Sequence, residues 1–263
     1  MRTVYVIGIG AGDPEHLTLQ AVSAIRRTDV FFTIDKGDVK GDLAALRSTL
    51  LARHAGASHR VVVARDPQRD RTAATARYAE AVTDWQERRA ALYERMLADE
   101  LGDDGSGAFL VWGDPAVYDG TLRILDRILE RIRERGAAAF DVVSIPGISA
   151  VQALAAAHRL VLNRVGRPFT VTTGRRLADE GPPAGVDDVV VMLDAVDAFA
   201  TVPVEGPDDR WDIYWGAYLG TPNQELVHGD LRQVRARIVA LRAELRERKG
   251  WIMDTYLLRR RTP

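Results

Sequence analysis

Cysteine is absent from this chain of 263 residues, and so are the motifs of several common enzyme classes. Without cysteine there is no disulfide, no thiolate nucleophile and no zinc–thiolate site. The five histidines are scattered and no H-x-x-x-H pair occurs, so we expect no metal site. A G-x-S-x-G elbow and a Walker loop are also missing, which leaves acyl-transfer hydrolases and nucleoside triphosphatases without support.

Long hydrophobic runs and a charge excess are missing as well. No stretch of about eighteen apolar residues occurs, and no basic leader precedes the first apolar segment, so we expect a cytoplasmic protein without a signal peptide. The net charge of −1 gives a nucleic-acid partner no electrostatic support. Three of the 36 basic residues are lysines, so 33 are arginines. This bias fits codon usage, although guanidinium groups also suit carboxylate or phosphate ligands.

Apolar and amphipathic segments alternate along the first half of the chain. We expect strands at 3–7, 30–34, 60–64 and 109–112, and helices at about 18–28, 42–54, 71–100 and 120–135. This pattern predicts an α/β fold whose N-terminal domain, residues 1–136, has a mainly parallel sheet.

The second half predicts a different arrangement. Strands are expected at 141–145, 169–173, 189–193, 212–215 and 251–258, with helices at 147–159 and 230–250. The segments predict a C-terminal domain, residues 137–263, with a mixed sheet.

Two of the expected helices have apolar stripes. In the helix 71–100 the stripe is interrupted by Arg89 and indicates a core-facing or dimer-forming surface; its members are Tyr78, Val82, Trp85, Leu92 and Met96. In the helix 230–250, Asp230 is the expected N-cap and Gly250 the stop. We expect the Arg-rich face opposite its stripe to be solvated.

Three glycine-centred turns stand where predicted strands end. They are Gly8-Ile9-Gly10-Ala11-Gly12, Gly113-Asp114-Pro115 and Pro146-Gly147-Ile148-Ser149-Ala150. Ligands bind at the carboxyl ends of strands in open α/β sheets, so three such turns in order predict one composite site.

The first turn has three interpretations. It resembles a dinucleotide-binding turn, and Asp35 stands near the place of a ribose-binding acid. Its spacing, however, is G-x-G-x-G rather than G-x-G-x-x-G, and Asp13-Pro14 follows at once, which disfavours a helix that opens on the third glycine. The alternatives are a purely structural tight turn and a substrate-facing loop, of which we favour the loop.

The other two turns each have a ligand-binding and a structural interpretation. Asp114 is placed to accept hydrogen bonds from ribose hydroxyls or an amino group, or it caps a helix that Pro115 begins. The small residues at 146–150 suit the edge of a heterocycle, or Ser149 caps the next helix. The apolar run 189–193 predicts a buried strand whose end presents Met192 to a ligand.

Taken in order, these segments resemble the tetrapyrrole (corrin/porphyrin) methylase family. The likeness covers essentially the whole chain and is carried by Val6–Ala21, Gly113–Pro115, Pro146–Ala150, Trp215–Pro222 and Gly229–Leu231. Within the family, Phe31–Gly37, the long helix and Trp251–Tyr256 are most similar to the branch that methylates C-1 of precorrin-5.

The resemblance implies a homodimer in which S-adenosylmethionine lies in a trough between two α/β domains. Cofactor contacts would fall on Trp112, Gly113, Asp114, Val117, Ser149, Ala150, Met192 and Leu219. The first turn would face a tetrapyrrole substrate through Gly8, Gly10, Gly12 and Asp13. Two residues depart from the family pattern, because Ala11 replaces the usual proline and Trp112 stands where glycine is frequent.

The implied reaction methylates C-1 of precorrin-5 and releases the C-20 acetyl group as acetate, which gives precorrin-6A. Methyl transfer from a sulfonium needs little acid–base machinery, since the leaving group is neutral and positioning supplies much of the acceleration. Acetate release needs water and a base, and Asp35 and Tyr118 near strand ends are the candidates. Another precorrin C-methyltransferase, a nicotinamide-dependent reductase and a non-catalytic tetrapyrrole-binding protein are the alternatives.

Overall fold

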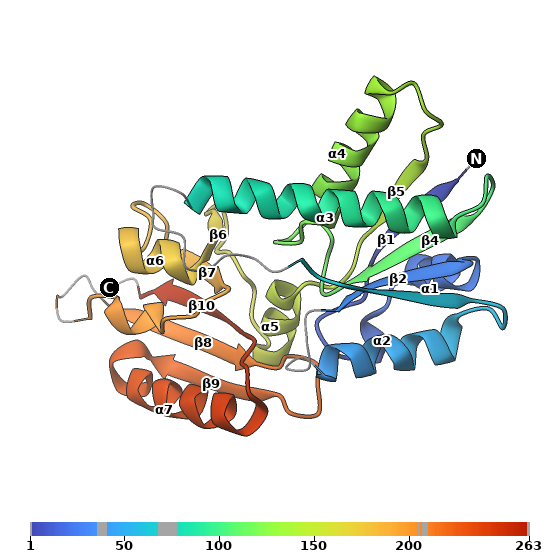
Figure 1. The fold of residues 1–263 in the computed structure, drawn as a ribbon. Coiled ribbons are helices and arrows are strands. Elements are labelled where there is room, and N and C mark those ends of the chain that lie inside the picture. Colours follow the sequence, from blue (N-terminus) through green and yellow to red (C-terminus); the bar gives the residue numbers. More distant parts are fainter. Residues whose placement is uncertain (1, 36–40, 68–77, 205, 207–209, 262–263) are drawn as a thin grey trace. The chain divides into compact units, whose positions relative to one another are not determined.

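The computed structural model describes residues 2–35, 41–67, 78–204, 206 and 210–261 (Figure 1). The chain forms two compact units, each built on a five-stranded sheet. Unit 1 comprises Met1–Gly10 and Pro14–Ile148, and unit 2 comprises Ala11–Asp13 and Ser149–Pro263. The short segment Ala11–Asp13 therefore belongs with the second half of the chain.

Unit 1 contains a wholly parallel sheet in the order β3-β2-β4-β1-β5. Its strands are β1 (Thr3–Gly8), β2 (Val30–Asp35), β3 (Arg60–Arg65), β4 (Ser106–Val111) and β5 (Asp141–Ile145). Because the strands are parallel, all five carboxyl ends lie along one edge of the sheet. That edge carries Asp35 and the glycine turns that follow β1, β4 and β5.

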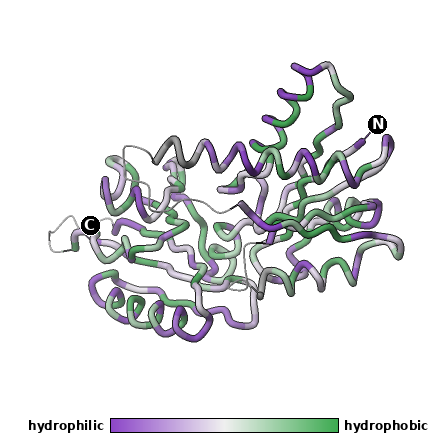
Figure 2. Tube along the Cα trace, in the orientation of Figure 1, coloured by the Kyte–Doolittle hydropathy of each residue, from purple (hydrophilic) through white to green (hydrophobic). Residues whose placement is uncertain are grey.

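Helices cover both faces of this sheet, as the connections between parallel strands require. They are α1 (Leu19–Arg26), α2 (Gly41–His54), α3 (Tyr78–Glu100) and α4 (Thr121–Glu134), with a 3₁₀ turn η1 (Pro14–His16) before α1. One core packs α1 and α2 against residues such as Ile7 and Phe31, and the other packs α3 and α4 against Val6 and Phe32. The strands are accordingly largely apolar along their length, as the hydropathy colouring shows (Figure 2).

Unit 2 contains a mixed sheet in the order β6-β7-β10-β8-β9, in which only β6 and β7 are parallel. Its strands are β6 (Phe169–Thr173), β7 (Asp188–Met192), β8 (Trp211–Ala217), β9 (Glu225–Asp230) and β10 (Asp254–Arg260). Since β10 runs antiparallel to both neighbours, its first residues lie beside the last residues of β7 and β8.

The helices of unit 2 are α5 (Ala150–His158), α6 (Gly174–Glu180) and α7 (Leu231–Lys249), with a 3₁₀ turn η4 (Ala198–Thr201). The α7 helix packs against a core that includes Trp215, Ile238 and Tyr256. The α5 helix packs on the other cluster, with Leu154 and Val190. Asp230 caps α7 and Gly250 ends it with φ +73°, as expected.

The α/β fold, with a parallel first sheet and a mixed second sheet, is confirmed, but the expected domain boundary is displaced. β5 pairs with β1 in register Thr3↔Asp141, so it completes the first sheet instead of opening the second. The chain consequently divides after Ile148 rather than at residue 136. Of the expected helix 71–100, residues 71–77 lie outside the described residues.

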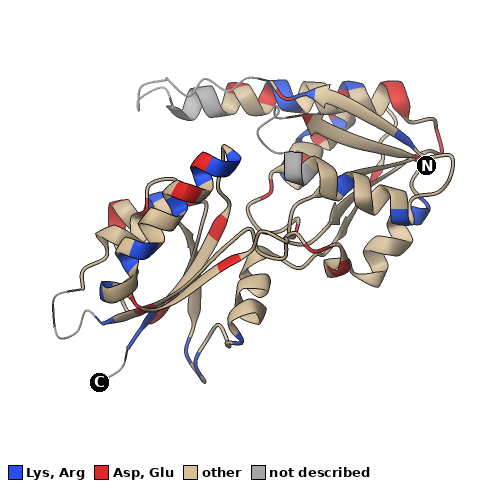
Figure 3. Cartoon of the chain, turned by 90° about the horizontal axis from the view of Figure 1, so that it is seen from below, with Lys and Arg blue, Asp and Glu red and all other residues tan. Residues whose placement is uncertain are grey.

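Charges of both signs alternate along the helices, while the strands are largely uncharged (Figure 3). Among the helices of the described residues, none combines the length and apolar character needed to cross a membrane.

Candidate functional site

The three glycine turns converge at the carboxyl edge of the sheet in unit 1. A Cβ built on Gly8 would lie 2.6 Å from the nitrogen of Gly147 and 2.7 Å from the carbonyl oxygen of Gly113. A Cβ on Gly147 would lie 2.2 Å from the same oxygen. The turns approach each other so closely at Gly8 and Gly147 that only glycine fits there, so the three turns form one packed structure.

The carboxylate of Asp114 fastens the third turn to the second. Its Oδ2 accepts a hydrogen bond from the backbone amide of Gly147 at 2.9 Å, and its Oδ1 accepts one from Ala116 at 2.7 Å. The expected helix beginning at Pro115 is not formed, because residues 115–118 make a turn and α4 starts only at Thr121. The structural interpretation of Asp114 as a helix cap is therefore wrong.

Internal packing also explains the remaining glycines of the first turn. Gly10 bridges Gly113 by two backbone hydrogen bonds, and a Cβ on it would lie 2.4 Å from the Cβ of His16. In unit 2, a Cβ on Gly12 would lie 2.5 Å from the carbonyl oxygen of Leu219. These contacts account for the glycines whether or not the turn also meets a substrate.

Other expected site residues of unit 1 surround the second turn or lie along the same sheet edge. Trp112 packs partly buried on the α1–α2 core, and its indole nitrogen is buried with no hydrogen-bond partner among the described residues. Val117 is half-buried, and its backbone amide donates to the carbonyl of Asp114 at 3.1 Å. Tyr118 is 45% exposed with φ +53°, and Asp35 is exposed at the end of β2.

Three expected contact residues come together in unit 2. Ala150, Met192 and Leu219 belong to one apolar cluster, which also contains the substituted residue Ala11. Ser149 caps α5 by accepting a hydrogen bond from the amide of Val151 at 3.1 Å, so its structural interpretation is confirmed. Asp13, two residues after Ala11 in the sequence, is half-buried.

Sequence reasoning missed a buried polar group on α3. Arg89, the residue that interrupts the apolar stripe, lies 2.9 Å from a carboxylate oxygen of Asp66 and donates to the hydroxyl of Tyr93 at 3.0 Å. Burial raises the pKa of Tyr93 to about 12, although Arg89 opposes the shift. The interruption of the stripe was itself the available signal, since an arginine on a core-facing position needs a partner.

Arg47 on α2 was also missed. Its Nε donates to the carbonyl of Leu110 on β4 at 3.2 Å, and burial lowers its pKa. The backbone pairing of β4 with β2 stops at Phe109, although β4 stays paired with β1 at Leu110, so Arg47 takes up a carbonyl beyond the part of β4 that pairs with β2.

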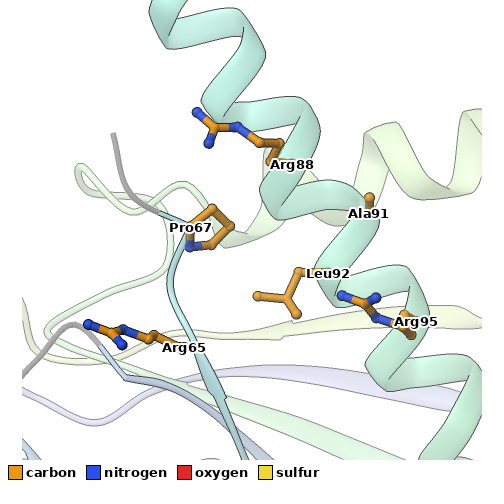
Figure 4. A pocket seen from close by; sticks show the side chains of 6 residues that line it. All are labelled: Arg65, Pro67, Arg88, Ala91, Leu92 and Arg95. Atoms are coloured by element: carbon orange, nitrogen blue, oxygen red, sulfur yellow. The ribbon is translucent and has the colours of Figure 1, made fainter. Parts of the chain in front are cut away.

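A pocket of about 420 Å³ lies between the end of β3 and α3 (Figure 4). It is lined by Arg65, Pro67, Arg88, Ala91, Leu92 and Arg95. Arg65 points away from α3, whereas Leu92 points toward the strand, and Arg88 is paired with Asp84 at 2.8 Å. The arginines do not converge on a common point, and none of the expected site residues lines the pocket.

The part of the chain that the structure describes contains no set of side chains suited to hold a metal ion. No group of three or more His, Asp or Glu side chains there is arranged to hold a metal ion. The arrangement instead offers closely packed backbone, one carboxylate and apolar side chains at strand ends.

Comparison with known proteins gives a consistent result. The family model for tetrapyrrole (corrin/porphyrin) methylases matches residues 3–235. A precorrin-6A synthase (deacetylating) from a Sinorhizobium species is 46% identical over 266 residues, which cover 99% of this chain and 96% of that protein.

Solved structures agree with this relationship. A cobalamin synthesis related protein from Corynebacterium diphtheriae is 40% identical with a TM-score of 0.82, and the match covers 99% of both chains. A uroporphyrin-III-C-methyltransferase from Thermus thermophilus shares the fold, with 21% identity, a TM-score of 0.58 and coverage of 98% of this chain and 92% of that one. From its fold, its converging turns and these full-length matches, the chain belongs to the tetrapyrrole (corrin/porphyrin) methylase family.

Proposed function

We propose that the protein is an S-adenosylmethionine-dependent C-methyltransferase that methylates C-1 of precorrin-5. The observation that carries this proposal is the 46% identity to a precorrin-6A synthase (deacetylating) over 99% of the chain. In this reaction the C-20 acetyl group leaves as acetate and the product is precorrin-6A. We also propose that the enzyme is a cytoplasmic homodimer, as the family resemblance implies.

The proposed cofactor contacts come from both units. They are Trp112, Gly113, Asp114 and Val117 in unit 1, and Ser149, Ala150, Met192 and Leu219 in unit 2. The residues fit such a ligand: Asp114 keeps lone pairs for hydroxyl or ammonium donors, and the indole N–H of Trp112 has no hydrogen-bond partner among the described residues. Met192 and Leu219 add apolar surface. A related methyltransferase from Thermus thermophilus was solved with S-adenosylhomocysteine.

S-adenosylmethionine supplies a methyl group on a positively charged sulfur, whose departure as a neutral thioether needs no proton donor. The chain's task is then mainly to orient the two reactants, which supplies much of the acceleration of such a transfer. The glycine turns suit this task because their mutual contacts leave little freedom. Gly8, Gly10, Gly12 and Asp13 are the proposed contacts with the tetrapyrrole.

Acetate release is a separate hydrolytic step. Water adds to the acetyl carbonyl, the carbon–carbon bond between the acetyl group and the macrocycle breaks, its electron pair stays on the macrocycle, and the acyl carbon leaves as acetate. Asp35 and Tyr118 are our candidates to accept or hold the proton of that water. Both lie on turns or strand ends of unit 1 and are exposed. If Asp35→Asn methylates and releases acetate at the normal rate, Asp35 has no such role.

The test is an incubation of the purified protein with precorrin-5 and methyl-labelled S-adenosylmethionine. We expect a labelled corrinoid and acetate in equal amounts. Methylation at another carbon without acetate would indicate a different precorrin C-methyltransferase. Binding of precorrin-5 without labelled product would favour a non-catalytic protein, and tight binding of a nicotinamide cofactor without S-adenosylmethionine would favour a reductase.

A further inference from the structure

A buried ion cluster lies beneath α7 in unit 2. Arg242, which lies between Ile238 and Leu245 on the buried face of α7, is 1% exposed. Its Nε lies 2.8 Å from one carboxylate oxygen of Asp254, and a terminal nitrogen donates to the other at 3.3 Å. The indole of Trp215 donates to the same carboxylate at 2.6 Å. Buried charges persist only when paired and hydrogen-bonded, so this network fixes the guanidinium in place.

The same guanidinium holds the segment that follows β7. It donates to the backbone carbonyl of Asp194 and pairs with the carboxylate of Asp197. The side chain of Asp194 accepts hydrogen bonds from the hydroxyl of Tyr256 at 2.8 Å and from the amides of Val196 and Ala198 at 2.9 and 2.8 Å. Residues 194–198 are thereby tied to α7 and to β10.

The cluster also reaches the turn that follows β8. Asp254 opens β10 opposite Ala217, the last residue of β8, and the next residue, Thr255, stands opposite Met192. The amide of Tyr218 donates to the carbonyl of Met253 at 2.9 Å. A single buried network therefore supports the chain just after β7 and just after β8.

Both of these segments contain a non-glycine residue in the left-handed region. Leu193 has φ +54° and is 64% exposed, while Tyr218 has φ +48° and is buried. Such conformations persist only where the surroundings impose them, and they concentrate at functional sites. Leu193 follows the proposed cofactor contact Met192, and Tyr218 precedes the contact Leu219.

We infer that Arg242 is a positioning residue that holds Met192 and Leu219 in the geometry that binds S-adenosylmethionine. It acts through Asp254 and the backbone at Asp194. The inference rests on the proposed function, because it gives a role to the backbone beside two proposed contacts.

The test compares Arg242→Lys with a matched control, Arg259→Lys. Arg259 forms another ion pair of unit 2, with its Nε 2.5 Å from the fully buried carboxylate of Asp188. Asp188 begins β7 and Met192 ends it, so the control lies roughly 13 Å from the proposed contact at the ordinary rise of a strand. Each variant keeps the positive charge and loses the guanidinium fork.

We expect both variants to unfold at lower urea concentration but only Arg242→Lys to bind S-adenosylhomocysteine weakly, by about tenfold in calorimetry. In steady-state assays, the KM for S-adenosylmethionine should rise by a similar factor, with kcat at saturation little changed. Equal affinity for wild type and Arg242→Lys, or equal weakening in both variants, would overturn the inference.

If Arg242→Lys does not fold, Asp197→Asn tests the inference instead. The Asp197 side chain is 35% exposed, and asparagine tolerates the left-handed backbone found there, so the fold should survive. We expect a smaller loss of S-adenosylhomocysteine affinity in the same direction, and unchanged affinity would overturn the inference. A wild-type protein that binds no S-adenosylhomocysteine would instead contradict the proposed function, and the inference with it.

Discussion

At the scale of single residues, one carboxylate joins two turns of the composite structure. Asp114 accepts hydrogen bonds from its own turn, at Ala116, and from the neighbouring turn, at Gly147. The hydrogen bond that the structure gives the nearby Asp119 within the described residues is a local one, from the amide of Thr121 at 2.7 Å. Loss of Asp119 would therefore free a single turn, whereas loss of Asp114 would also separate two turns.

Replacing Asp114 tests that difference. Asp114→Ala leaves the amide of Gly147 without its acceptor, and we expect a loss of about 1–3 kcal/mol in the free energy of unfolding together with weak binding of S-adenosylhomocysteine. Asp119→Ala should cost about 1 kcal/mol, as the loss of a local cap does, and leave that binding intact. Urea unfolding and calorimetry measure the two effects. Equal affinity in both variants would show that the link between the turns is not needed.

Tyr93 gives a pH dependence of known sign. Burial raises its pKa to about 12, against about 10 in the unfolded chain. Below pH 10 the phenol is protonated in both states and has no effect. Between about pH 10 and 12 the unfolded chain loses the proton first, so the free energy of unfolding falls as pH rises, by at most about 1.4 kcal/mol per pH unit.

Urea unfolding of wild type and Tyr93→Phe across this range measures the contribution. The buried Tyr256 also has a raised pKa, so the variant should keep a pH dependence, but a shallower one. Parallel slopes for the two proteins, or a Tyr93 phenol that titrates near pH 10 in the folded state, would contradict the assignment.

At the scale of elements, the turns that follow β4 and β5 can approach each other because glycine there has no side chain. A methyl group on Gly147 would lie 2.2 Å from the carbonyl oxygen of Gly113, so the ends of β5 and β4 would have to move apart. We expect Gly147→Ala to lose about 2 kcal/mol of stability in unit 1 and most of its methyl transfer activity.

Gly102→Ala is the matched control, because a Cβ there meets no atom within 4 Å. Its stability should change by less than about 0.5 kcal/mol and its activity should match wild type. Thermal unfolding and the labelled methyl assay distinguish the variants. A fully active, stable Gly147→Ala would show that the strand ends tolerate displacement.

The elements also show what sequence reasoning can and cannot find. The strands 141–145 and 169–173 were expected with the bounds that the structure has, because each is a short run rich in β-branched residues. β9 and α6 were not expected, since Val227 is the one β-branched residue of β9 and Leu177 the one large apolar residue that α6 buries. Periodicity shows burial only where the buried residues are apolar.

The helix α7 shows that apolar periodicity also misses buried charged residues. Arg242 stands four residues after Ile238 and three before Leu245, on the buried face of the helix. Its partner Asp254 lies on β10, twelve residues later in the chain, and its partner Asp194 lies in the segment after β7, 48 residues earlier. A local sequence pattern around Arg242 therefore contains neither partner. The composite turns were predictable because glycine spacing is local, and the network that supports the segments of unit 2 was not.

At the scale of the whole molecule, each unit has its own sheet and its own cores, yet the proposed cofactor contacts are divided between the units. A ligand that contacts residues of both must stabilise both. With S-adenosylhomocysteine at about a hundred times its Kd, the linked stabilisation is about 2.7 kcal/mol, which corresponds to about hundredfold slower exchange of amides that open only in the free protein.

Hydrogen exchange with and without S-adenosylhomocysteine therefore tests the division of the site. We expect slower exchange at residues 113–117 of unit 1 and at residues 192–194 and 217–221 of unit 2, with little change in β3, whose strand lies at the far edge of its sheet from β5. Arg242→Lys should lose protection at 192–194 and 217–221 before it loses protection at 113–117, because its partners lie only in unit 2. Protection confined to one unit in the wild-type protein would contradict a cofactor site built from both.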